Sequence, residues 1–203
     1  LRLNLRHPDA VRGRIEVIEG RRLSVELISQ NEDEVAQRLI CKMTGRHSGQ
    51  FFWPGEVAAD ISLFVRVFLI GASGGIGSAT ARRLRASGFD VTLAGRQAAK
   101  LSSLAEELGC AAVTVDATDF DALDAAVQAA APLGAVVNCA GSQLLKPAHF
   151  TTAKEFQDTV AANLTTAFAA VRAGAKAMMN SGGSIVLCAT AAARAGFANH
   201  EAI

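Results

Sequence analysis

Apolar and polar positions follow two different patterns along the chain, and the change falls near residue 65. Beyond it, short apolar runs such as Val67–Ile70 and Ala135–Val137 alternate with longer stretches that have helical spacing. Five such runs separated by helical stretches are typical of parallel strands joined by crossover helices. The runs are apolar throughout, as expected of strands that helices cover on both faces. We predict an α/β fold with a Rossmann-like, doubly wound parallel sheet over residues 65–203, incomplete at the C-terminus.

Residues 1–64 carry a separate pattern. Apolar and polar residues alternate on both sides of Glu19-Gly20, which predicts a β-hairpin, and residues 31–43 have a helical pattern that ends before Gly45. A hairpin and one helix bury too little apolar surface to be secure alone. We therefore predict a small N-terminal segment of uncertain α+β structure. It is either an extra domain or a stretch that is not native to the α/β domain.

Composition excludes several classes of function. Lys and Arg (20) nearly balance Asp and Glu (19), so the chain offers no broad basic surface for nucleic acid. It contains neither a signal peptide pattern nor an apolar run long enough to span a membrane. The four cysteines are Cys41, Cys110, Cys139 and Cys188, which stand far apart without a C-x-x-C pair. His7 and His47 lack partners at metal-ligand spacing. We expect a cytoplasmic protein with reduced thiols and no metal.

A glycine-rich turn follows the first apolar run and precedes a helical stretch. Glycine permits a tight turn, lets the backbone approach a pyrophosphate, and lets the helix pack closely on the strand. The helix N-terminus adds free N–H groups and the positive end of its dipole. We predict that this turn binds the pyrophosphate of a dinucleotide through Gly71, Ser73, Gly74, Gly75, Ile76 and Gly77.

The second apolar run ends at Gly95-Arg96, without the acidic residue that would bind the ribose hydroxyls of NAD. The planar cation of Arg96 suits a 2′-phosphate instead. This favours NADP(H) over NAD(H) as the cofactor. The alternative is that Arg96 is only a solvated residue in the first turn of the next helix.

Two further segments complete an ordered set of motifs. The third run leads into Asp116-Ala117-Thr118-Asp119, and the fourth into Asn138-Cys139-Ala140-Gly141. With the glycine turn, these segments resemble the T-G-x-x-x-G-x-G, D-x-[ST]-D and N-N-A-G motifs of the short-chain dehydrogenase/reductase family. Ile70 replaces the leading Thr and Cys139 the second Asn. The resemblance implies further cofactor-binding residues, Asp116, Ala117, Asn138, Ala140 and Gly141. Alternatively or in addition, Asp119 caps the next helix.

The resemblance also locates the catalytic positions. Asn163 matches an Asn that bends a helix and holds a water in a proton relay, and its amide needs a partner inside an apolar helix. Thr190 falls at the place of a Ser that binds the substrate oxygen. The place of the catalytic Tyr falls on Ile203, that of the Lys lies beyond it, and the chain contains no Tyr. His200 is either a substitute proton donor or an ordinary loop histidine.

The expected function is that of an NADP-dependent oxidoreductase, which transfers hydride between NADP(H) and a carbonyl compound or secondary alcohol. We expect its full-length form to be a homo-oligomer, with no nucleic acid or membrane partner, and this chain alone to be weak or inactive. Two alternatives remain open. One is an NADP(H)-binding module without turnover, and the other is an inactive fragment that lacks the Tyr/Lys pair.

Overall fold

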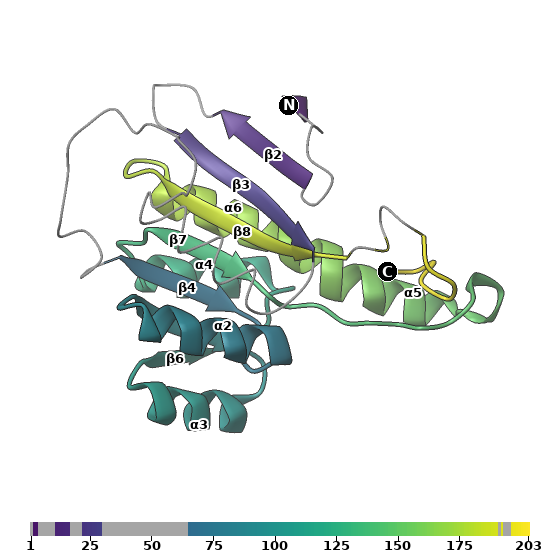
Figure 1. Ribbon diagram of the computed structural model, residues 1–203, viewed down its shortest axis with the longest axis horizontal. Coiled ribbons are helices and arrows are strands. Elements are labelled where there is room, and N and C mark those ends of the chain that lie inside the picture. Colours follow the sequence, from purple (N-terminus) through teal and green to yellow (C-terminus); the bar gives the residue numbers. More distant parts are fainter. Residues whose placement is uncertain (1, 4–10, 17–21, 30–64, 191, 193–195) are drawn as a thin grey trace.

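The computed structural model describes residues 2–3, 11–16, 22–29, 65–190, 192 and 196–203, with backbone alone up to residue 29. Five parallel strands form the main sheet, in the order β8-β7-β4-β5-β6 (Figure 1). Their bounds are β4 (Arg66–Ile70), β5 (Asp90–Gly95), β6 (Ala111–Thr114), β7 (Ala135–Asn138) and β8 (Gly183–Ala189). The chain order reverses at β4, where a doubly wound sheet opens a crevice at the carboxyl ends of its strands. The predicted Rossmann-like sheet is confirmed.

Helices cover both faces of this sheet. α2 (Gly75–Ala86) and α3 (Ala98–Leu108) lie on one face, and α4 (Phe120–Ala129) and α6 (Thr166–Met178) lie on the other. Alternate residues of β4 face opposite sides: Leu69 packs with the α2 and α3 side chains, and Phe68 with those of α4 and α6. Both are fully buried. Burial on two faces explains why the strands are apolar at every position.

The N-terminal strands extend the same sheet. β2 (Val11–Glu16) pairs antiparallel with β3 (Arg22–Ser29), which matches the hairpin predicted around Glu19-Gly20, and β1 (Arg2–Leu3) pairs with β2. β3 runs parallel to β8 (Figure 1). The sequence did not predict this pairing, because it joins backbone groups of segments that lie far apart in the chain. The helix expected over residues 31–43 lies outside the described residues, as do His7 and His47.

One helical stretch extends beyond the sheet. It comprises α5 (Ala153–Val160), a π-helical turn η3 (Ala161–Thr165) and α6, within the predicted 152–180 region, and follows the short 3-10 helix η2 (Ala148–Phe150). A capping box begins α5: Glu155 accepts from the N–H of Thr152, and the Thr152 hydroxyl accepts from that of Glu155. Among the described residues, no helix is long and apolar enough to cross a membrane.

Candidate cofactor site

The glycine-rich turn is held by a hydrogen bond within its own backbone. Gly71 has a φ of 76°, and the N–H of Gly74 donates to its carbonyl oxygen at 3.1 Å. A Cβ on Gly71 would collide with the backbone of Ala140, and a Cβ on Gly77 with the carbonyl oxygen of Gly71. Glycine is therefore required at both positions, where the turn meets the end of β7 and where α2 packs on the turn.

The N-terminus of α2 opens toward solvent. The helix begins at Gly75, and its N-cap residue, Gly74, has no side chain to accept from the first N–H groups. These N–H groups lack intrahelical partners, and no acidic residue lies in the first turn. Gly75 and Ile76 are exposed, whereas Gly77 is buried beneath them. The arrangement suits a bound anion such as a pyrophosphate.

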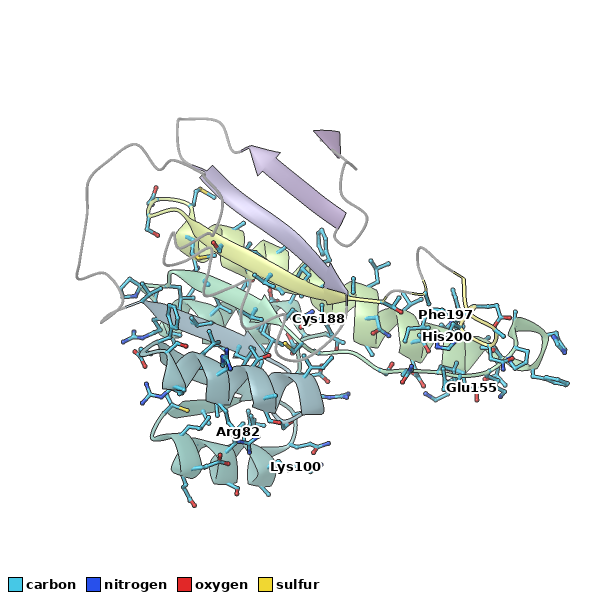
Figure 2. The ribbon with its side chains drawn as sticks, in the orientation of Figure 1. Arg82, Lys100, Glu155, Cys188, Phe197 and His200 are labelled. Atoms are coloured by element: carbon cyan, nitrogen blue, oxygen red, sulfur yellow. The ribbon has the colours of Figure 1, made fainter. Side chains whose placement is uncertain are left out.

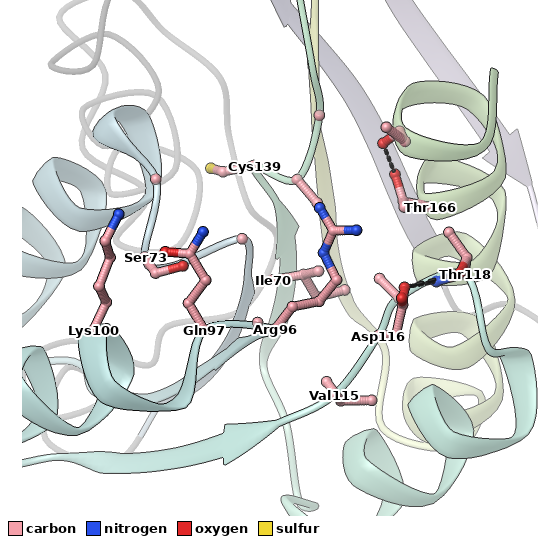
Figure 3. A pocket seen from close by; sticks show the side chains of 17 residues that line it. Ile70, Ser73, Arg96, Gln97, Lys100, Val115, Asp116, Thr118, Cys139 and Thr166 are labelled. Atoms are coloured by element: carbon pink, nitrogen blue, oxygen red, sulfur yellow. Dashed lines mark hydrogen bonds between the residues drawn. The ribbon is translucent and has the colours of Figure 1, made fainter. Parts of the chain in front are cut away.

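A cleft of about 240 Å³ lies at the carboxyl ends of β4 to β7 (Figure 3). It brings together most of the cofactor-binding residues predicted from the sequence: Gly71, Ser73, Gly74, Arg96, Asp116, Ala117, Ala140 and Gly141. Its lining also includes Gln97, Lys100, Thr118, Cys139 and Thr166, which sequence reasoning did not assign. Lys100 had a detectable signal, because it stands close after Arg96 in the sequence, in the first turn of α3. Thr166 had none, since it comes from a distant helix.

Positive charge predominates in the cleft. Arg96 and Lys100 are exposed there, neither makes an ion pair with a described residue, and Asp116 is the one carboxylate in the lining. Figure 3 shows the Arg96 guanidinium between Gln97 and Lys100 on one side and Asp116 on the other. Hydrogen bonds from the N–H (2.9 Å) and hydroxyl (2.8 Å) of Thr118 lower the pKa of Asp116, and Arg96 adds a smaller effect. Asp116 is therefore held as an anion.

Asn138 lies beneath the cleft rather than in its lining. It is 2% exposed, its Oδ1 accepts from the N–H of Ala140 at 3.0 Å, and its Nδ2 donates to Thr166 Oγ1 at 3.4 Å. The side chain thus fixes the turn after β7 and ties it to α6. Asp119 caps α4 by accepting from the N–H groups of Asp121 and Ala122, which confirms the capping role predicted from the sequence.

Asn163 lies in the π-helical turn and ties it to the loop after β7. Its Nδ2 donates to the carbonyl oxygens of Thr159 (2.9 Å) and Ser142 (3.1 Å), and its Oδ1 accepts from the N–H of Ser142 (3.2 Å). The amide therefore has the partners that its position demanded. Asn163 does not line the cleft, and its part in a proton relay stays a prediction.

The remaining catalytic candidates do not converge on the cleft. Thr190 Oγ1 accepts from the N–H of Ala192 at 3.1 Å. His200 lies beside Phe197 (Figure 2), with 5.6 Å between the ring centroids, and its Nδ1 is 2.9 Å from the carbonyl oxygen of Ala198. Neither residue lines the cleft, and neither does Ile203. The described residues contain no group of His, Cys, Asp or Glu side chains arranged to hold a metal ion.

A reversed strand order, a glycine turn at the switch point and a cationic cleft define the class of nucleotide-binding α/β proteins. A family profile described as short chain dehydrogenase matches residues 66–202. The chain belongs to this family, whose members bind nicotinamide cofactors.

Relatives of known activity are similar to this chain. L-xylulose reductase of Mesocricetus auratus is 33% identical over 67% of this chain and 57% of its own length. Carbonyl reductase [NADPH] 2 of Sus scrofa is 34% identical over 60% of this chain and 51% of its own. A short chain dehydrogenase from Mycobacterium smegmatis matches the structure with a TM-score of 0.66 and 27% identity, over 70% of this chain and 64% of its own. The chain thus spans about half the length of these curated relatives.

Proposed function

We propose that the cleft binds NADP(H) and that the protein is an oxidoreductase acting on a small carbonyl compound or secondary alcohol. The observation that carries the proposal is Arg96, whose guanidinium lies in the cleft at the end of β5 without an ion pair to any described residue, at a position where the sequence has no acidic residue. The Sus scrofa relative is by name an NADPH-dependent carbonyl reductase, and the Mesocricetus auratus relative is by name a sugar reductase. Both names support this class of substrate.

Each part of the cleft has a role in this proposal. The N–H groups at the start of α2 bind the pyrophosphate, with the glycines keeping the space that a Cβ would fill. Arg96 and Lys100 bind the 2′-phosphate through charge-assisted hydrogen bonds. As the family resemblance implies, Asp116 would face the adenine, and Ala140 and Gly141 in the same lining would leave room for the ribose. The bound cofactor would supply or accept the hydride.

The chain's own residues contribute less to the chemistry. Thr190 would orient the substrate oxygen with its hydroxyl hydrogen, since its oxygen already accepts from Ala192. Asn163 would position the loop at Ser142 through the contacts described above. Reduction of a carbonyl also needs a proton donor. We assign none here, because Ile203 stands at the position of the family's Tyr and the sequence has no Tyr.

A second candidate function follows from the presence of Ile203 at the position of the family's Tyr. The chain would then bind NADP(H) without turning it over, as a cofactor-responsive module. Stopped-flow measurement of hydride transfer with a broad panel of carbonyl compounds separates the two functions. Oxidation of bound NADPH by any member of the panel supports the reductase. Tight binding with no oxidation across the panel supports the module.

The cofactor assignment is tested by Arg96→Ala, with binding of NADPH and NADH measured from nicotinamide fluorescence. Loss of a charge-assisted contact of about 1–3 kcal/mol predicts NADPH binding weakened about 5- to 150-fold, with NADH nearly unchanged. Arg82→Ala is the matched control, because Arg82 pairs with Glu107 on the surface outside the cleft. Equal weakening of both cofactors by Arg96→Ala would contradict the assignment.

The same proposal includes the location, the domain bounds and the self-association of the protein. We place it in the cytoplasm, with residues 65–203 as its cofactor domain, and expect it to self-associate. The exposed apolar side chains of Leu164 (66%) and Phe168 (58%) on the long helix support self-association. Absence of a cooperative melting transition, or a midpoint that NADPH does not raise, would contradict cofactor binding by this chain.

A further inference from the structure

Two cysteines stand side by side at the carboxyl ends of neighbouring strands. Cys139 directly follows β7, and Cys188 lies in β8. The last paired residues of these strands are Asn138 and Leu187, so the two cysteines occupy the next position of the same register. Their Sγ atoms lie 3.5 Å apart. Although 49 residues separate them in the chain, the sheet makes them immediate neighbours.

The surroundings of this thiol pair give its members different reactivity. Both side chains pack against the apolar cluster beneath α2, and both residues are partly exposed. The hydrogen bond with Cys139 lowers the pKa of Cys188. The same contact, followed by burial, raises the pKa of Cys139. Cys188 is therefore the first of the two to become a thiolate, which is the nucleophilic form of cysteine.

The proposed function leaves both thiols without a role. Cys139 lines the cofactor cleft, but no step assigned above uses its sulfur. A disulfide needs an S–S separation of about 2.05 Å, so the sulfur atoms must approach by about 1.5 Å. Adjacent strands already hold their backbones together, which leaves small side-chain rotations and local backbone adjustment to close that gap.

We propose that Cys139 and Cys188 form a redox-active dithiol that closes reversibly to a disulfide beside the cleft. A low-molecular-weight disulfide is the oxidant. The Cys188 thiolate attacks one of its sulfur atoms, breaks its S–S bond and releases one thiolate, which takes up a proton. Cys139 then gives up its proton and attacks the sulfur of Cys188 in the mixed disulfide, which releases the second thiol. Two protein thiols are oxidised, and one external disulfide is reduced to two thiols.

Cys110 provides a matched control. It is also a free cysteine, partly buried against the same side of the sheet, and burial raises its pKa. It precedes β6 and so lies at the opposite end of the strands from Cys139 and Cys188. A reaction that needs paired thiols at the carboxyl ends will not involve it.

The test treats the full folded chain with glutathione disulfide, blocks the remaining thiols, digests without reduction and identifies bridged peptides by mass. We expect one bridge joining Cys139 to Cys188, reversed by dithiothreitol, absent in Cys139→Ser and Cys188→Ser, and retained in Cys110→Ser. Full alkylation of both cysteines after oxidant treatment, or a bridge to Cys41 or Cys110 instead, would overturn the proposal.

A second measurement does not depend on disulfide closure. Phenylarsine oxide bridges two neighbouring thiolates, so the reduced chain should bind one equivalent. Cys139→Ser should abolish this binding and Cys110→Ser should keep it, with circular dichroism establishing that each variant is folded. Equal binding by the unsubstituted chain and Cys139→Ser would show that the two thiols do not act as a pair, and the proposal would fail.

Discussion

The carboxyl ends of β4, β5 and β6 differ sharply from the segment that follows β8. The first region is joined across the sheet by backbone hydrogen bonds, from Ala72 to Ala94 and from Val115 to Gly95. In the second region, the side chains of Thr190 and His200 make hydrogen bonds, among the described residues, only to backbone groups two positions away in the chain. The carboxyl ends of β4, β5 and β6, together called the nucleotide region, are therefore held in place by backbone geometry. The catalytic positions would have to be brought together by contacts that the described residues do not make.

The largest effect should come from placing a side chain in the nucleotide region. We predict that Gly71→Ala lowers the free energy of unfolding by about 4 kcal/mol or more, because the added Cβ meets the backbone of Ala140 at a positive φ. Urea unfolding followed by circular dichroism measures the change.

Gly88→Ala is the control for backbone strain alone. Gly88 has a φ of 86° with no atom close to the added Cβ, so it should cost only about 1 kcal/mol. Similar losses for Gly71→Ala and Gly88→Ala would mean that close packing at the turn does not define the nucleotide region.

A smaller effect is expected at the loop that follows β7. Asn163→Ala removes the contacts that tie the π-helical turn to the loop at Ser142, at an expected cost of about 1–3 kcal/mol. Asn180→Ala, an exposed position just after α6, should change the stability by less than about 0.5 kcal/mol. Equal effects of these two substitutions in urea unfolding would show that the loop at Ser142 does not depend on Asn163.

The same contrast explains how far the sequence predicted the molecule. The strands, the helices and most of the cleft were readable because each depends on residues close in the chain, such as the Gly71–Gly77 turn or Asp116-Ala117. Pairing of β3 with β8, and of Cys139 with Cys188, depends on register between distant segments and carries no local signal. Asn138 was predicted to bind the cofactor, but its buried side chain supports the cleft rather than lining it.

Lowering the pH should reduce the stability of the protein through Glu155 at the start of α5. Hydrogen bonds from Lys146 and then from Thr152 lower its pKa from 4.5 to about 2. Its contribution to stability is therefore complete above about pH 4.5 and is lost as the pH falls toward 2, because the unfolded state takes up the proton first. We predict that Glu155→Gln melts below the unsubstituted chain at neutral pH and that the difference shrinks through this window. A difference that stays constant from neutral pH to pH 2 would contradict this assignment.

The smallest effect on cofactor binding should come from substitution of Lys100. Lys100 lies in the cleft in the first turn of α3, close to Arg96 in the sequence, but its flexible ammonium acts as a point charge rather than as a planar fork. We expect Lys100→Ala to weaken NADPH binding by about 2- to 5-fold, corresponding to an exposed charge contact of about 0.5–1 kcal/mol. Lys154→Ala, which removes an exposed lysine paired with Asp158 outside the cleft, is the control. Because only NADPH carries the 2′-phosphate, NADH binding should not change. A loss shared by both cofactors would assign Lys100 to the pyrophosphate instead, and Arg96 would then be the single cation that distinguishes them.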